Sequence, residues 1–170
     1  MEARSRTLTL ALSIVFFGAT PTPQTAQMLQ AKFDQDADVM HRAKLMMALS
    51  RADFDQIAQQ VSSGDATDAL KMLQQLFSDA QQCSMSLDAK EANPESHPSG
   101  FKQLQIATRE SLRRLDDVTV GLPGDEQAPF LAIRKNLDQL NRYLIRELFP
   151  HQPQPADPEV PVPGRRGATN

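Results

Sequence analysis

The fold class of this chain is decided by residues 128–149, APFLAIRKNLDQLNRYLIRELF. Apolar residues recur there every three or four positions, which places them on one side of an α-helix. Leu131, Ile145 and Phe149 widen that stripe, and Pro150 ends the helix. At about 1.5 Å per residue the helix is roughly 30 Å long, so it requires partner helices to cover its apolar side. The stripe itself consists of Phe130, Ile133, Leu137, Leu140, Leu144 and Leu148.

Two earlier segments with the same periodicity are predicted to form a helical hairpin. The first runs from about residue 38 to residue 63, with the alternative of a break near Ser50, and follows a shorter helical piece at 26–33. The second runs from residue 66 to about residue 92. Between them, Gly64 is expected to adopt the left-handed conformation that ends a helix. A connection this short makes the two long helices antiparallel neighbours.

A loop rich in proline and polar residues at 93–100 separates this hairpin from a second one. Ser99 is expected to cap a third long helix, and the turn GLPG at 121–124 leads into the helix described first. Valine, isoleucine and threonine do not alternate as they do in strands, and no Asn-Gly or Asp-Gly turn is present. The sequence therefore predicts an all-α fold: a single bundle of about four long antiparallel helices, running up-down-up-down as the hairpins 38–92 and 99–149.

The two ends of the chain differ from the predicted bundle. Two arginines followed by about a dozen apolar residues are typical of a secretory signal, and the run is too short to span a bilayer. We expect residues 1–26 to contain this signal, with cleavage between 19 and 26. The alternatives are an uncleaved N-terminal anchor and a buried hydrophobic helix. Residues 27–150 would then form an extracytoplasmic domain, periplasmic or secreted, and the proline-rich residues 151–170 are expected to be a disordered tail.

Three aspartates at the start of the first long helix suggest a metal site. Asp34, Asp36 and Asp38 match the first three ligand positions of a calcium loop, but the glycine and the glutamate that the loop also requires are absent. Carboxylates at a helix N-terminus are favoured by the helix dipole, which explains the same residues. His41 shares a helical face with Asp38, yet two side chains do not select a metal. No metal site is therefore predicted.

No catalytic constellation is recognisable either. Cys83 is the single cysteine and lies in an apolar stripe, which predicts a buried, inert thiol, with pairing between chains as the alternative. Protease chemistry would need His41 or His97 to meet it in space. Adjacent carboxylates such as Asp116 and Asp117 point apart on a helix, and nucleophile-elbow and phosphate-loop motifs are missing. The sequence thus predicts no catalytic residue and no cofactor.

Charge and methionine content bear on two further kinds of function, nucleic-acid binding and copper binding. A formal net charge of −3 with 5% aromatic residues disfavours nucleic-acid binding. Arg109 and Arg113 form a small basic ridge, although surface ion pairs with Asp116, Asp117 and Asp138 are the expected use of the arginines. Core filling is the expected role of most methionines, with thioether copper binding as the alternative. These are Met28, Met40, Met46, Met47, Met72 and Met85.

The segment GDATDAL, residues 64–70, resembles the turn of a tetratricopeptide-type helix pair, in which Gly-Asp closes one helix and an Ala-Leu face opens the next. It does not recur, whereas a repeat array needs about three units near 34 residues each. The resemblance implies a helical-hairpin interaction module. The sequence as a whole favours a non-catalytic binding or scaffold protein of the cell envelope, acting on a protein partner. The alternative is a metal-responsive periplasmic helical protein.

Overall fold

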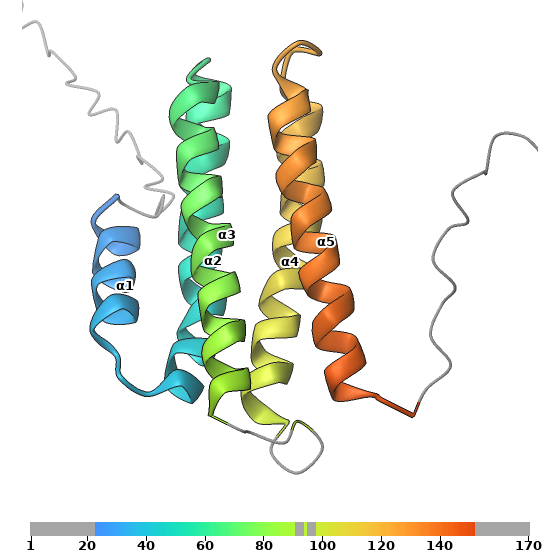
Figure 1. Cartoon of the computed structure of the whole chain (residues 1–170). Coiled ribbons are helices and arrows are strands. Elements are labelled where there is room, and N and C mark those ends of the chain that lie inside the picture. Colours follow the sequence, from blue (N-terminus) through green and yellow to red (C-terminus); the bar gives the residue numbers. More distant parts are fainter. Residues whose placement is uncertain (1–22, 91–93, 95–97, 152–170) are drawn as a thin grey trace, which may run out of the picture.

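The computed structural model describes residues 23–90, 94 and 98–151, and all regular structure in these residues is α-helical, which confirms the predicted all-α class. Four long helices follow a shorter one (Figure 1). None of these helices is long and apolar enough to cross a bilayer. Most of the predicted signal segment and of the predicted tail lies outside the described residues. The helices are α1 (Pro23–Gln35), α2 (Val39–Ser62), α3 (Ala66–Ala89), α4 (Ser99–Val120) and α5 (Gln127–Leu148).

The helices of the first hairpin begin and end close to the predicted positions. Asp38 is the N-cap of α2, and its side chain accepts a hydrogen bond of 2.9 Å from the Met40 backbone N–H. Gly64 has the predicted left-handed conformation, with a φ of +83°, and Asp65 then caps α3. α2 continues through Ser50 without interruption, so a break at this residue does not occur.

The second hairpin begins differently from the prediction. Ser99 is the first residue of α4 and not its N-cap; Pro98 occupies the cap position and offers no side-chain hydrogen bond. The cause is the proline ring, which holds φ at −70°, a helical value, so that the helical backbone starts one residue earlier. α5 starts at Gln127 after Glu126 at its cap, and ends before Phe149.

α2 and α4 lie side by side and run in the same direction. The hydroxyls of Ser50 and Ser111 meet at 2.7 Å near the middle of both helices, and Met40 approaches Gly100 near their beginnings. The two pairs have nearly the same sequence separation, which only parallel neighbours can maintain. The helix directions alternate as predicted, but α4 packs beside α2 and α5 beside α3, while α2 and α5 do not contact each other. We call the contact between α2 and α4 the α2–α4 seam.

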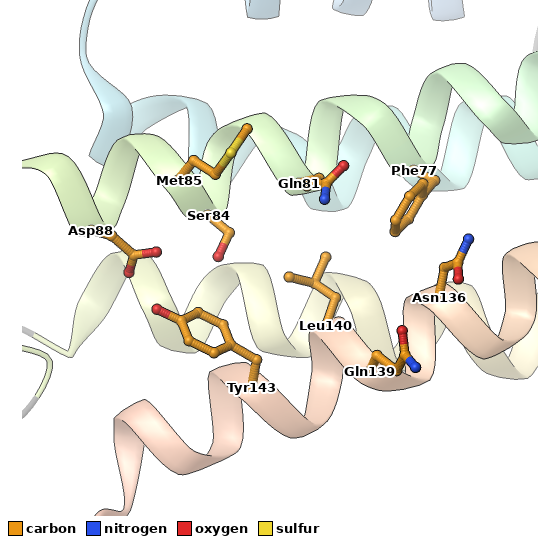
Figure 2. Close-up of a pocket in the computed structure, with 9 residues that line it drawn as sticks. All are labelled: Phe77, Gln81, Ser84, Met85, Asp88, Asn136, Gln139, Leu140 and Tyr143. Atoms are coloured by element: carbon orange, nitrogen blue, oxygen red, sulfur yellow. The ribbon is translucent and has the colours of Figure 1, made fainter.

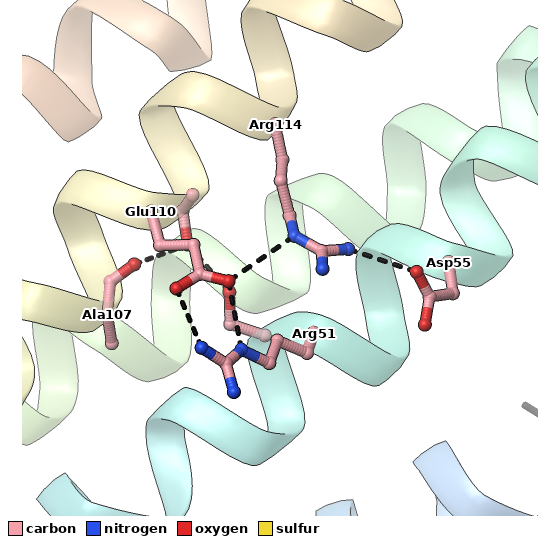
Figure 3. Close-up of polar contacts among 7 residues, drawn as sticks. Arg51, Asp55, Ala107, Glu110 and Arg114 are labelled. Carbon is pink, nitrogen blue, oxygen red and sulfur yellow. Dashed lines mark hydrogen bonds and ion pairs between the residues drawn. The ribbon is translucent and has the colours of Figure 1, made fainter.

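Four charged side chains bridge the solvent edge of the α2–α4 seam (Figure 3). Arg51 donates to both carboxylate oxygens of Glu110, at 2.9 and 3.0 Å. Arg114 donates to Asp55 at 3.0 Å, and its Nε lies 3.6 Å from Glu110. The hydrogen bond from Arg51 lowers the pKa of Glu110, so this carboxylate stays ionised at neutral pH. The four charges thus link two parallel helices that no turn connects directly.

Burial differs between the central helix and the outer one. α2 packs against α1, α3 and α4, whereas α5 packs only against α4 and α3. Leu131, Ile145 and Phe149 were expected to widen the buried stripe of α5, but they are 47, 37 and 49% exposed because none of the described helices covers that side. Leu140 and Leu148 are half-buried. The residues of the predicted stripe that do reach the core are Phe130, Ile133, Leu137 and Leu144.

Candidate functional site

A groove separates α3 from α5, the outer helices of the two hairpins (Figure 2). Each is antiparallel to the helix before it, so α3 and α5 run in the same direction, as α2 and α4 do. The groove encloses about 580 Å³ and is open to solvent. Its lining consists of Phe77, Gln81, Ser84, Met85 and Asp88 from α3, and Asn136, Gln139, Leu140 and Tyr143 from α5.

The groove has apolar side chains at its centre and amides along its edges. Phe77, Leu140 and Tyr143 are half-buried, and the side chains of Leu140 and Phe77 point into the space between the helices (Figure 2). Met85 is 57% exposed, so its side chain adds accessible apolar area to the groove. An apolar centre within a polar rim is the arrangement found in protein–protein interfaces. The exposed amides at the edges belong to Gln81, Asn136 and Gln139.

Tyr143 and Asp88 form a polar contact at one end of the groove. The Tyr143 hydroxyl donates a hydrogen bond to the Asp88 carboxylate, and burial followed by this contact raises the pKa of Tyr143 to about 12. The phenol therefore stays neutral and remains a donor at physiological pH. Ser84 is the other hydroxyl of the lining, and the described lining contains no histidine or cysteine to activate it. The described lining thus presents apolar side chains, amides, two hydroxyls and one carboxylate.

Two carboxyl groups that the sequence did not predict to be buried lie inside the bundle. Asp53 and Asp79 are 8 and 4% exposed, and burial followed by the charge of Asp79 raises the pKa of Asp53 to about 7. Acidic residues in an amphipathic helix normally face solvent, and only the packing of α1 and α2 against α3 encloses these two. A signal was nevertheless present: Asp79 lies three residues after Leu76 and four before Cys83, on the buried stripe of α3.

Two of the three aspartates, Asp36 and Asp38, make contacts at the start of α2, whereas Asp34 belongs to α1. Asp36 accepts a hydrogen bond from the Asp38 backbone N–H and forms an ion pair with His41, while Asp34 accepts one from the Gln30 amide. His41 therefore pairs with Asp36 and not with Asp38, whose side chain is turned toward the backbone of its own helix. Within the described residues, no group of three His, Cys, Asp or Glu side chains could hold a metal ion.

The thiol and the thioethers have different surroundings. Cys83 is fully buried, and burial raises its pKa to about 11, which confirms the predicted buried thiol and leaves it unreactive. Protease chemistry would need His41 or His97 beside this thiol, and His97 lies outside the described residues. Met46 fills the core as expected, but Met28 and Met85 are mostly exposed, so core filling does not describe them. Half-buried positions belong to Met40, Met47 and Met72.

The remaining charged candidates lie on the surface. Asp116 and Asp138 accept hydrogen bonds from Arg134 and Arg142 of α5, so the ion pairs of these aspartates are made with arginines other than the expected Arg109 and Arg113. Asp117 is exposed. Arg109 and Arg113 line a shallow hollow on α4 together with neutral residues and a glutamate, so the basic ridge exists but is small. Single exposed charges of this kind contribute little to stability or to specific recognition.

Known proteins do not supply a function for these sites. Comparison with protein-family models, with curated proteins and with solved structures found no match to this chain. The resemblance of residues 64–70 to a tetratricopeptide turn is therefore confined to one helical hairpin. Function has to be inferred from the groove between α3 and α5.

Proposed function

We propose that this chain is a non-catalytic binding protein of the cell envelope, which holds an amphipathic helix of a protein partner in the groove between α3 and α5. The observation that supports this most strongly is the groove itself, with Phe77, Leu140 and Tyr143 at its centre and Met85 exposed beside them. Apolar side chains kept accessible on an otherwise well-packed bundle mark interaction surfaces.

A helix suits the groove better than an extended segment. The groove walls are themselves α-helices, whose backbone N–H and C=O groups are already paired within α3 and α5. An extended peptide would therefore find no sheet edge to pair with, whereas a helix satisfies its own backbone. From Phe77 to Asp88 the groove follows about 16 Å of helix, at about 1.5 Å per residue. This length accommodates about three turns, with apolar anchors at i, i+4 and i+7.

Photo-crosslinking can test the groove as the binding surface. A photoreactive phenylalanine analogue at position 85 or 139, in the full chain expressed in its native cells, should yield one adduct of discrete mass. The matched control carries the same analogue at Val120, which is 86% exposed at the end of α4 and remote from the groove lining. Adding Leu140→Glu should abolish the adduct from position 85, because it places a charge among the apolar anchors.

The adduct mass identifies the occupant. Twice the mass of the chain would show a second copy, and a crosslink within one chain would show that the chain fills its own groove. Either outcome overturns the proposal of a separate protein partner. Equal adducts from Val120 and from the two groove positions, or no adduct at all, would show that the groove is not a specific binding surface.

Export is the part of the proposal that rests on the N-terminal sequence pattern. α1 begins at Pro23, and Ala26 is 5% exposed within the bundle. Cleavage after Ala26 would remove the first turn of α1, so we expect processing between residues 19 and 22, which leaves the helix whole. N-terminal sequencing of the protein from an envelope fraction measures this directly. Recovery of unprocessed chain from the cytoplasm alone would contradict export.

A further inference from the structure

α1 is attached to the rest of the bundle by few contacts. It packs along α2, where its Phe33 is almost completely buried. Its polar contact with α3 is made by Gln30, whose amide nitrogen donates to Asp79 at 3.1 Å and to Asp34 at 2.9 Å. The N-terminal helix thus depends on a few apolar side chains, Ala26, Leu29 and Phe33, and on one amide that reaches across to a buried carboxyl group. A short helix with so few attachments is a candidate for local opening.

The space beneath α1 is a small cleft whose accessible surface is mostly apolar, with Ala26 and Met72 in its lining. It encloses about 170 Å³, and Asp53 lines it together with glutamines from all three surrounding helices. Gln75 donates to the second oxygen of Asp79 at 2.9 Å, so both oxygens of that carboxyl group accept amide hydrogen bonds. Burial raises the pKa of Asp79, and the hydrogen bonds from the two glutamines, which favour the ionised form, offset only part of this shift. Asp53 lines the cleft and is 8% exposed, and the charge of Asp79 acts on it.

The charged groups around this pair are not balanced. From α1, Asp34 adds further negative potential at Asp79. From α2, the neighbouring charges Arg51 and Asp55 are engaged by residues of α4 across the α2–α4 seam. Among the described groups that shift the pKa of Asp53 or of Asp79, none is a cation. Asp53 and Asp79 can therefore hold one negative charge between them more easily than two, because a second buried charge is repelled by the first.

We propose that α1 is a proton-controlled latch, closed on the α2–α3 hairpin while Asp53 carries a proton and released when that proton is lost. Opening α1 hydrates both carboxyl groups and so relieves the repulsion between Asp53 and Asp79. By linkage, a proton that binds more tightly to the closed form favours closing. Because burial and Asp79 raise the pKa of Asp53 to about 7, the latch closes at mildly acidic pH and opens at mildly alkaline pH. Opening would uncover the apolar side of α1 and the surface of α2 beneath it.

Amide hydrogen exchange of the full chain tests the latch. Protection factors, which correct for the intrinsic pH dependence of exchange, are compared at about pH 5.5 and about pH 8.5. In the unmodified chain the protection of α1 should fall at least about tenfold between these values, while that of α3 changes much less. Asp53→Asn keeps the size of the side chain and removes the charge, so its α1 should stay protected at both values.

Two further variants separate the latch from general effects. Asp55→Asn removes a carboxylate two residues away that faces α4, and it should leave the pH response of α1 intact. Gln30→Ala removes the link to Asp79 and should lower the protection of α1 at both pH values. Equal protection of α1 at both values in the unmodified chain would overturn the proposal. So would a pH response that survives in Asp53→Asn, and neither result bears on the groove between α3 and α5.

Discussion

The α2–α4 seam and the groove between α3 and α5 are both contacts between parallel helices, yet one is closed and the other is open. In the seam, Ser50 and Ser111 meet at 2.7 Å, and Gly100 leaves room for Met40. In the groove, the facing positions carry large side chains, among them Phe77 and Tyr143, that keep the two helices apart. The difference shows that the size of the residues at the contact, and not helix direction, decides whether two neighbours close.

The α2–α4 seam and the groove between α3 and α5 also differ in the charges that they carry. The edge of the seam is bridged by Arg51, Glu110, Arg114 and Asp55, whose opposite charges are arranged in sequence along two helices. The described lining of the groove contains a single charged side chain, Asp88, with amides elsewhere along its edges. The charged groups at the edge of the seam are thus paired with one another, whereas the groove leaves donors, acceptors and apolar area available to a partner.

The largest expected effect comes from the same substitution at a buried serine of each region. Ser111→Leu inserts volume into a closed contact and leaves Ser50 without its hydroxyl partner, so it should lower the free energy of unfolding by about 2–4 kcal/mol. Ser84→Leu adds the same atoms beside an open groove and should cost less than about 1 kcal/mol. Urea denaturation of the two variants measures both values. Equal losses would show that the groove is as tightly packed as the seam.

A smaller effect is expected from the two carboxylates of α2 that face opposite sides. Asp55 is paired with Arg114, whereas Asp53 is buried near Asp79. The raised pKa of Asp53 means that its favourable contribution is complete below about pH 4 and is lost as pH rises through about 7. Asp53→Asn should therefore increase the free energy of unfolding at about pH 8 by roughly 1–3 kcal/mol and flatten its pH dependence. Chemical denaturation at several values across this pH range measures the free energy of unfolding. If the variant were less stable than the parent at about pH 8, the raised pKa assigned to Asp53 would be refuted.

The ionic edge of the seam should contribute less again. Glu110→Gln removes the partner of Arg51, and we expect the melting temperature to fall by only a few degrees, because the pair is near solvent. The lowered pKa of Glu110 means that this contribution is present above its unfolded pKa near about 4.3 and is lost as pH falls below it. Asp88→Asn at the end of the groove is the matched control and should change the melting temperature less. Calorimetry at low and high salt measures the melting temperatures of the Glu110→Gln and Asp88→Asn variants and so compares the two effects.

The smallest effect is expected from ending the chain after His151. Residues 152–170 are rich in proline and poor in apolar side chains, so they offer little surface to bury. Thermal melting of the truncated chain should coincide with that of the full chain. A midpoint lowered by many degrees would show that this segment packs on the bundle, and protection of Tyr143 from solvent in the full chain alone would locate it in the groove.

Local sequence was sufficient for the helices themselves. Asp38 and Gly64 predicted where α2 begins and ends, because capping and left-handed backbone conformations depend on the residue and its immediate neighbours. Pro98 shows the limit of that reasoning: a serine that looked like a cap follows a proline that already has a helical φ. The period of three to four residues also identified the core positions Leu137 and Leu144.

The groove and the buried acids were decided by tertiary structure. Leu140 belongs to the same stripe as Leu137, but it borders the groove because α5 leans on α4 and leaves α3 at a distance. Asp53 and Asp79 come from different helices, and their pKa shifts exist only because packing brings them under α1. The physical reason is that periodicity records which side of a helix is apolar, whereas the choice of neighbour depends on how side chains from distant segments fit together.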